Sequence, residues 1–183
     1  HGLSDLGENR AEELARKRAT VQDGRARWHM IGHVQRRKAP RLVGIADLVH
    51  SIDSVRLAER LSKAAVEAGE VVPVLVQVNT SGEESKSGFQ GGGLKDEVLS
   101  VLGLPGLEVR GLMTMAPFTS DEASLRRTFA GVRILHEELG ALEGYCGDHL
   151  SMGMTNDFEI AIEEGSTMIR IGTALFGKRM DHD

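Results

Sequence analysis

The segment whose residue types most clearly suggest a binding site is Gly165-Ser-Thr-Met-Ile-Arg-Ile-Gly-Thr173, near the end of the sequence. If it begins as a strand, alternation places Arg170 on the face opposite its two isoleucine neighbours. A buried arginine is costly unless it meets an acceptor. Glycine lets an anion approach the backbone closely, and the N–H groups at the start of a helix bind anions. We therefore predict that Arg170, Gly172 and Thr173 form one anion-binding site.

A structural role for the same residues is open at this point. Arg170 would then pair with a carboxylate inside the fold, and Gly172 with Thr173 would only cap a helix. Thr155 ends the preceding segment Ser151-Met-Gly-Met-Thr155 and has two compatible interpretations. Its hydroxyl can cap a short helix predicted at residues 157–164, or it can bind a phosphate at the start of that helix.

Other titratable side chains are spread along the chain. His29 and His33 are four residues apart, but a strand and then a loop separate them, so they share no helix face. No histidine spacing resembles a zinc site, and we expect no metal. Asp5, Glu8 and Asp53 are predicted near strand ends, where a carboxylate can serve as acid or base. For Glu8 and Asp53 the expected role is to orient the backbone or a neighbouring arginine.

The elements that must position these residues are short apolar runs alternating with helical patterns. The clearest run is residues 72–79, whose Val/Leu content is typical of a strand buried on both faces. The predicted strands are residues 4–7, 27–32, 48–52, 72–79, 109–115, 149–152 and 168–171, and the predicted helices are residues 12–19, 55–68, 94–102, 125–139 and 157–164. Repeated βα units of this kind predict an α/β fold with a parallel sheet.

Either a closed barrel or a doubly wound sheet fits this order. No Gly-x-Gly-x-x-Gly sequence follows the first strand, which favours a parallel (β/α)8 TIM-type barrel. Such a barrel has eight strands and typically about 250 residues. We predict a single, partial barrel domain over residues 1–183 with about seven βα units, so that the first strand and the preceding helix lie upstream of His1. The loops after the last two strands of such barrels commonly bind phosphate.

Composition narrows the class of partner. The net charge is −5 with both signs interspersed, and aromatic residues are only 4%, so no nucleic-acid partner is expected. No apolar run reaches the roughly 18 residues that a membrane span needs. The single cysteine, Cys146, excludes an internal disulfide and fits a reducing compartment. We expect a cytoplasmic protein, and a monomer, because no amphipathic arm or second domain is evident.

Several segments together resemble one known family, the pyridoxal phosphate homeostasis proteins, which are similar in fold to the barrel domain of alanine racemase. The stretch from Thr155 to Gly177, with Leu150-Ser-Met-Gly-Met154 ahead of it, looks like the family's C-terminal signature. The other matching segments are Leu6-Gly-Glu-Asn-Arg10, Trp28-His-Met-Ile-Gly32, His50-Ser-Ile-Asp53, Val78-Asn-Thr-Ser81, Glu84-Ser-Lys-Ser-Gly88 and Arg110-Gly-Leu-Met-Thr-Met115.

The resemblance implies a protein that binds pyridoxal 5′-phosphate, and that carries and buffers it in vitamin B6 homeostasis without committed catalytic turnover. Arg170 corresponds to the arginine that faces the pyridine nitrogen, and Asn9 to the asparagine beside the ring. Thr155, Gly172 and Thr173 correspond to the phosphate-binding positions. A guanidinium at the ring nitrogen should disfavour a proton there and so weaken the ring as an electron sink. Apo-enzymes that depend on pyridoxal phosphate are the implied recipients.

The resemblance also implies a lysine that this chain does not supply. The family's Schiff-base lysine lies on the first strand, so we expect it upstream of His1 and assign no catalytic residue here. Lys38 and Lys86 lie in predicted strand-end loops and are expected to be solvated.

Two other functions remain open from the sequence. The first is a pyridoxal phosphate-dependent amino-acid racemase-like enzyme. Such enzymes usually carry a second, β-rich domain after the barrel and take a tyrosine base from a partner subunit. The one tyrosine of this chain, Tyr145, lies before the predicted strand 149–152. The second is a barrel that binds another phosphorylated metabolite.

Overall fold

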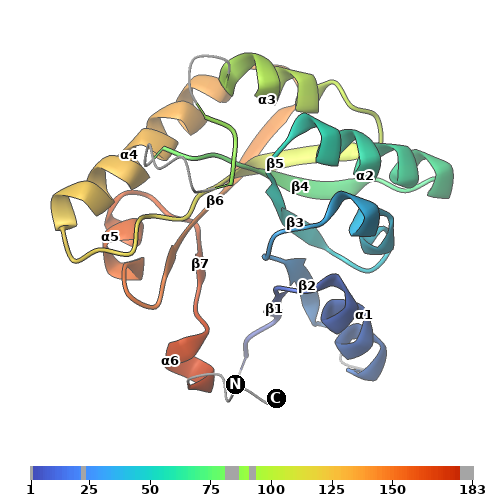
Figure 1. Cartoon of the computed structure of the whole chain (residues 1–183), viewed down its shortest axis with the longest axis horizontal. Helices are drawn as coiled ribbons and strands as arrows, with labels where there is room; N and C mark the ends of the chain where they lie inside the picture. Colours follow the sequence, from blue (N-terminus) through green and yellow to red (C-terminus); the bar gives the residue numbers. More distant parts are fainter. Residues whose placement is uncertain (1, 22–23, 81–86, 91–93, 178–183) are drawn as a thin grey trace.

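In the part of the chain that the structure describes, seven parallel strands form one sheet, and their order in space is their order in the sequence. The computed structural model describes residues 2–21, 24–80, 87–90 and 94–177. The strands are β1 (Asp5–Glu8), β2 (Arg27–Met30), β3 (Leu48–Ile52), β4 (Val72–Gln77), β5 (Leu107–Met113), β6 (Tyr145–Met154) and β7 (Met168–Arg170). The sheet curls into a nearly closed barrel with the helices outside it (Figure 1). The predicted parallel α/β barrel is confirmed.

The two edge strands of the sheet are β1 and β7. β1 pairs with β2, and β7 pairs with β6. Among the described residues no ladder joins β1 to β7. The proposal that a further strand lies upstream of His1 stays a prediction.

The helices that separate the strands are α1 (Ala11–Thr20), α2 (Val55–Ala68), α3 (Leu94–Leu102), α4 (Glu122–Leu139), α5 (Phe158–Glu163) and α6 (Thr173–Phe176), together with a 3₁₀ helix, η1 (Arg36–Leu42). The bounds of α2 and α3 are those predicted. α4 begins three residues before the predicted start at 125, because the Asp121 carboxylate accepts a hydrogen bond from the Ala123 N–H at 3.1 Å. η1 was not predicted, since Pro40 and its charged neighbours give it no apolar period.

Side chains on the strands alternate between two apolar layers. Leu75 belongs to a small inner cluster with Leu48 and Met113. Its neighbours Val74 and Val76 belong instead to the large cluster that also contains the buried faces of the helices. This explains why β4 is apolar from Val72 to Val76: each of its two faces is covered, and burying one such side chain stabilises the fold by roughly 1.5–3 kcal/mol.

In the described part of the chain, no helix has both the length and the apolar character needed to cross a membrane.

Candidate functional site at the carboxyl ends of the strands

Arg170 is the last residue of β7, and its guanidinium lies across the ends of the two preceding strands. Nη1 donates to the backbone oxygen of Ser151 at 2.8 Å and to its Oγ at 2.6 Å. Nη2 donates to the backbone oxygen of Thr114 at 2.7 Å. The predicted inward direction of this side chain is confirmed.

The acceptors of Arg170 are neutral oxygens. The structural alternative required a carboxylate partner, and among the described residues no ion pair with Arg170 occurs. Burial lowers the pKa of Arg170 to about 10, which leaves the guanidinium charged at neutral pH. An arginine has five N–H groups, and three of those on Arg170 are used by Ser151 and Thr114. Its Nε–H and one Nη2–H are therefore available to a ligand.

Thr155 directly follows β6, next to the end of β7, because Met154 pairs with Arg170 across the two strands. The prediction that Thr155 caps the helix at 157–164 is wrong. The N-cap position of α5 is Asp157, whose Oδ1 accepts from the Met154 N–H at 2.5 Å and so closes the turn. Thr155 is half-buried, and nothing in the described part of the chain hydrogen-bonds to its hydroxyl. It is free to bind a ligand.

Gly172 and Thr173 continue from β7 into α6. Gly172 is the N-cap residue, and its backbone oxygen accepts from the N–H groups of Leu175 and Phe176. No described side chain caps this helix, so the first N–H groups of α6 have no side-chain acceptor and can donate to a ligand. A Cβ placed on Gly172 would meet nothing within 4 Å, and its φ of −118° is open to any residue. The fold itself therefore does not require glycine here.

Asn9 follows β1, the strand at the other edge of the sheet, and it is exposed. A Cβ on Gly32 would lie 2.4 Å from the backbone oxygen of Asn9, so the chain after β2 packs closely on the turn after β1. Asn9 also lines a cavity of about 200 Å³ with Gln35 and Lys38. Thr155, Arg170, Gly172 and Thr173 are thus at adjoining strand ends, and Asn9 reaches the same end of the barrel from the far edge of the sheet.

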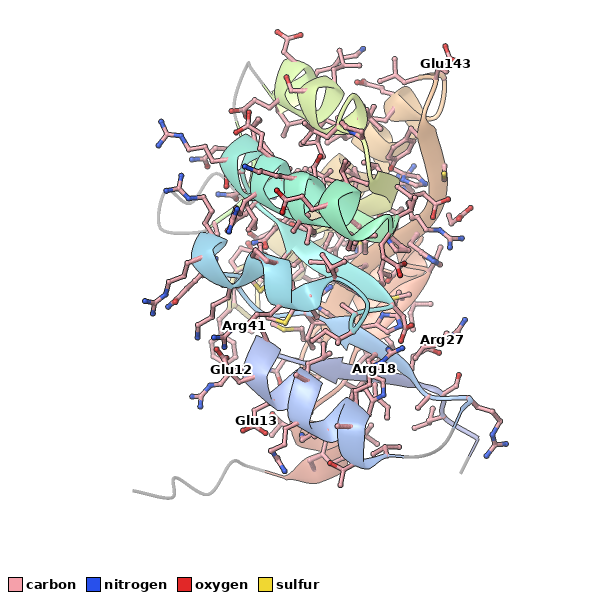
Figure 2. The ribbon with its side chains drawn as sticks, turned by 90° about the vertical axis from the view of Figure 1, so that its right-hand side faces the viewer. Glu12, Glu13, Arg18, Arg27, Arg41 and Glu143 are labelled. Atoms are coloured by element: carbon pink, nitrogen blue, oxygen red, sulfur yellow. The ribbon has the colours of Figure 1, made fainter. Side chains whose placement is uncertain are left out.

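The lysines near this end are held by carboxylates. Lys38 pairs with Glu12 at 2.8 Å, and Arg41 pairs with the same carboxylate at 3.3 Å (Figure 2). Lys17 pairs with Glu8. The expected solvated Lys38 is therefore a surface ion-pair partner, and Lys86 lies outside the described residues.

The strand-end carboxylates have other partners than those predicted. Asp53 bonds to Nδ1 of His33 at 2.9 Å and accepts from the Ser54 hydroxyl at 3.2 Å, and Glu8 bonds to Lys17. Among the described residues neither carboxylate bonds to the backbone or to an arginine, which were the predicted partners. Asp5 is the first residue of β1, not a residue at its carboxyl end. Figure 2 shows its partner Arg27 at the end of the barrel opposite to Glu12 and Arg41.

A row of polar side chains inside the barrel was missed from the sequence. His29, His50 and Ser151 are buried, with 6%, 1% and 1% exposure. The Nδ1 atom of His29 lies 2.9 Å from Nε2 of His50, and Nδ1 of His50 lies 2.9 Å from Oγ of Ser151. The sequence feature that could have indicated this row is His50, a histidine at an inward position of the apolar strand 48–52. No three metal-ligating side chains gather among the residues that the structure describes.

Tyr145 begins β6, and its position bears on the racemase alternative. It is buried, and its hydroxyl lies 2.5 Å from Nδ1 of His136 on α4. Burial raises the pKa of Tyr145 well above its usual value. Met154, which lies beside Arg170, is at the other end of the same strand. Tyr145 is therefore remote from the candidate site.

This arrangement defines a class of protein: a parallel α/β barrel with an inward-facing arginine and a strand-to-helix turn at the carboxyl ends of its last two strands. Residues 1–180 match the family model of the alanine racemase N-terminal domain. The chain is 42% identical over 178 residues to a pyridoxal phosphate homeostasis protein of Aquifex aeolicus, covering 97% of this chain and 78% of that one. It is 41% identical to the protein of that name from Pseudomonas aeruginosa, covering 97% and 76%.

Solved structures agree with the sequence relatives. PipY of Synechococcus elongatus PCC7942, solved with PLP bound, superposes with a TM-score of 0.86 at 35% identity, over 96% of this chain and 82% of PipY. Alanine racemase of Clostridium difficile 630 has a TM-score of 0.81 at 15% identity, over 97% of this chain and 46% of the racemase, and so shares the fold. The chain belongs to the pyridoxal phosphate homeostasis protein family, within the larger family of alanine racemase N-terminal domains.

Proposed function

We propose that this protein binds pyridoxal 5′-phosphate at the carboxyl ends of its strands, and that it carries and buffers the cofactor in vitamin B6 homeostasis without committed turnover. The observation that carries the proposal is Arg170, a charged and half-buried guanidinium with neutral acceptors and two N–H groups left for a ligand. When bound, the cofactor supplies an aldehyde and an electron-accepting ring.

The residues present fit the two ends of this cofactor. The unbonded hydroxyl of Thr155, the open backbone at Gly172 and the first N–H groups of α6 offer donors and space for a phosphate. Arg170 would face the pyridine nitrogen, and its permanent charge would disfavour a proton on that atom. Asn9 would lie beside the ring. The proposed roles of Asn9, Thr155, Arg170, Gly172 and Thr173 are supported by their positions at the strand ends and by the family.

Cofactor binding can be measured without any covalent bond to the protein. Equilibrium dialysis of the purified protein against pyridoxal 5′-phosphate is expected to give saturable, one-to-one binding. Thr155→Val removes a hydroxyl that no described residue uses, so it should weaken binding by about tenfold and leave stability unchanged. Thr20→Val, an isosteric change on the exposed end of α1, is the matched control. Absence of binding by the unmodified protein would refute the proposal.

A carrier and a racemase-like enzyme differ in what happens to the α-hydrogen of an amino acid. The relatives are named for homeostasis, and Tyr145 is remote from the site. We therefore expect no rapid exchange of the alanine α-hydrogen when the protein, pyridoxal 5′-phosphate and alanine are incubated in deuterated water. Rapid exchange would favour the racemase-like alternative.

The proposed carrier has pyridoxal phosphate-dependent apo-enzymes as recipients and acts as a cytoplasmic monomer. Transfer is tested by adding protein loaded with the cofactor to an apo-enzyme and following the return of that enzyme's activity. Sedimentation velocity tests the monomer.

A further inference from the structure

A continuous line of polar groups crosses the interior of the barrel, from the start of β1 to the end of β7. It begins at Asp5, whose Oδ1 lies 3.0 Å from Nε2 of His29. It continues from His29 to His50 at 2.9 Å and from His50 to the Ser151 Oγ at 2.9 Å. It ends where the Arg170 Nη1 donates to the same Oγ at 2.6 Å.

The two ends of this line have fixed directions. A guanidinium can only donate hydrogen bonds, and a carboxylate can only accept them. Partial burial alone would raise the pKa of Asp5, but hydrogen bonds from Arg27 at 2.7 Å and from Ser4 lower it below its usual value, so Asp5 is ionised at neutral pH. Arg170 is charged at the other end.

Both histidines between these ends are neutral. Burial lowers the pKa of His29, against the charges of Asp5 and Asp47 that raise it. Burial lowers the pKa of His50 well below its usual value, and the positive charge of Arg170 acts in the same direction. Each ring therefore has one N–H group to donate and one nitrogen to accept with.

Only one arrangement of protons satisfies every contact. Because Asp5 accepts, His29 has its hydrogen on Nε2 and accepts through Nδ1. His50 must then donate from Nε2 and accept through Nδ1. The Ser151 hydroxyl donates to His50, so its lone pairs are turned towards the donating Nη1 of Arg170. All four hydrogen bonds run one way, from the guanidinium to the carboxylate.

We propose that Asp5, His29, His50 and Ser151 are positioning residues, and that this one-way relay fixes the guanidinium of Arg170 for contact with the ring nitrogen of the cofactor. The relay rests on the proposed function for its ligand. The Ser151 backbone oxygen and Oγ take both hydrogens of Nη1, and Thr114 takes one of Nη2. The guanidinium plane is thus set by protein groups, and its remaining N–H groups are presented in one orientation.

The relay also explains why the barrel buries polar side chains in an otherwise apolar interior, which is energetically costly. The inward-facing residues near the relay on β3, β4 and β5 are the apolar Leu48, Leu75 and Met113. The relay places two imidazoles and a hydroxyl in the same interior. Buried polar groups are tolerated only when each is hydrogen-bonded. No buried side-chain nitrogen or oxygen in the described residues lacks a partner.

The direction of the relay can be tested on the unliganded protein. Long-range ¹H–¹⁵N correlation spectra at pH 7.5 distinguish the two neutral forms of each imidazole. His29 and His50 are both expected as the Nε2–H form. A Nδ1–H form or an imidazolium at either position would overturn the relay, whether or not the protein binds pyridoxal 5′-phosphate.

The positioning role is tested with two ligands that differ at one atom, pyridoxal 5′-phosphate and its 1-deaza analogue, in which C–H replaces the ring nitrogen. His50→Phe keeps a flat aromatic ring but removes both ring nitrogens, so it interrupts the relay and should weaken binding of pyridoxal 5′-phosphate by about tenfold. Binding of the analogue should stay unchanged. His50→Gln, which again offers one acceptor and one donor, should recover affinity to within about threefold. His149→Gln, at a half-buried histidine of β6 outside the relay, is the matched control.

Each other outcome is informative. Unchanged binding of pyridoxal 5′-phosphate by His50→Phe, or equal losses for both ligands, would overturn the positioning role. If His50→Phe does not fold, Ser151→Ala removes only the hydroxyl that accepts from Arg170 and donates to His50, and it should give the same selective loss. Binding of neither ligand by the unmodified protein would count against the proposed function, and the histidine spectra would still decide the relay.

Discussion

At the scale of single residues, the informative feature is a mismatch between what the fold requires and what the chain contains. Arg170 is charged and turned inwards with neutral oxygens as its acceptors. The Thr155 hydroxyl has no partner among the described residues, and Gly172 has room for a side chain. At these adjoining strand ends, two residues have hydrogen-bond donors that the fold does not use, and a third leaves open space. This is expected of a binding site.

Gly172 gives the sharpest test of that idea. In Gly172→Ala the new methyl group meets no protein atom within 4 Å, and the φ of −118° suits alanine. We expect unchanged stability in urea denaturation, but binding of pyridoxal 5′-phosphate weakened by about tenfold or more, because the methyl group occupies the approach of the phosphate. Equal affinity of the variant and the unmodified protein would remove Gly172 from the phosphate site.

At the scale of elements, the close approach of β5 and β6 holds the site's supports in register. Met113 pairs with Ser151 across these strands, so Thr114 and Ser151 can both accept from Arg170. Gly111 permits the approach: its φ is +146°, and a Cβ there would lie 1.9 Å from the backbone oxygen of His149. Since a backbone atom must move to relieve such a contact, no side chain can be accommodated.

Gly111→Ala should therefore be severely destabilising. Both the unfavourable φ and the backbone clash act together, and we expect a loss of at least about 3 kcal/mol in the free energy of unfolding. Chemical denaturation followed by circular dichroism measures the loss. Gly24→Ala, where a Cβ meets nothing within 4 Å, is the control and should change stability by less than about 1 kcal/mol. A mild effect at Gly111 would contradict the described register of β5 and β6.

At the scale of the whole molecule, the barrel buries histidines in their neutral form. Burial lowers the pKa of His29, His50 and His149 on the strands, and of His136 on α4, whose ring contacts Tyr145. In the unfolded chain these groups titrate near pH 6.5. Below that pH the unfolded chain binds more protons than the folded one, so acid favours unfolding.

The free energy of unfolding should consequently fall as the pH decreases from 7.5 to 5.5. His29 and His50, which are almost fully buried, each contribute up to about 1.4 kcal/mol per pH unit below the unfolded pKa. Urea denaturation at several pH values provides the measurement, and His29→Gln should flatten the slope. The carboxylates with lowered pKa, Asp5 and Asp148, lose their contribution only at lower pH. Equal stability at pH 7.5 and 5.5 would show that the histidines are not buried neutral.

The sequence by itself determined the alternation of strands and helices and the parallel sheet, and it singled out Arg170, Gly172 and Thr173 as candidates for binding an anion. Hydrophobic periodicity is local, so α2 and α3 were predicted with their observed bounds, and inward alternation placed Arg170 correctly. Family resemblance added Asn9, which no pattern of spacing singles out. The 3₁₀ helix η1 was missed, because its stability comes from packing and not from an apolar period.

Only the tertiary structure decided which groups have partners. Hydrogen bonds between Arg170 and Thr114, and between His50 and Ser151, span 56 and 101 residues of sequence, and no local pattern encodes them. The same holds for Thr155, whose hydroxyl is free because Asp157 closes the turn in its place. The line from Asp5 to Arg170 exists because parallel strands from distant parts of the chain turn their inward faces to one interior, where polar side chains must find one another.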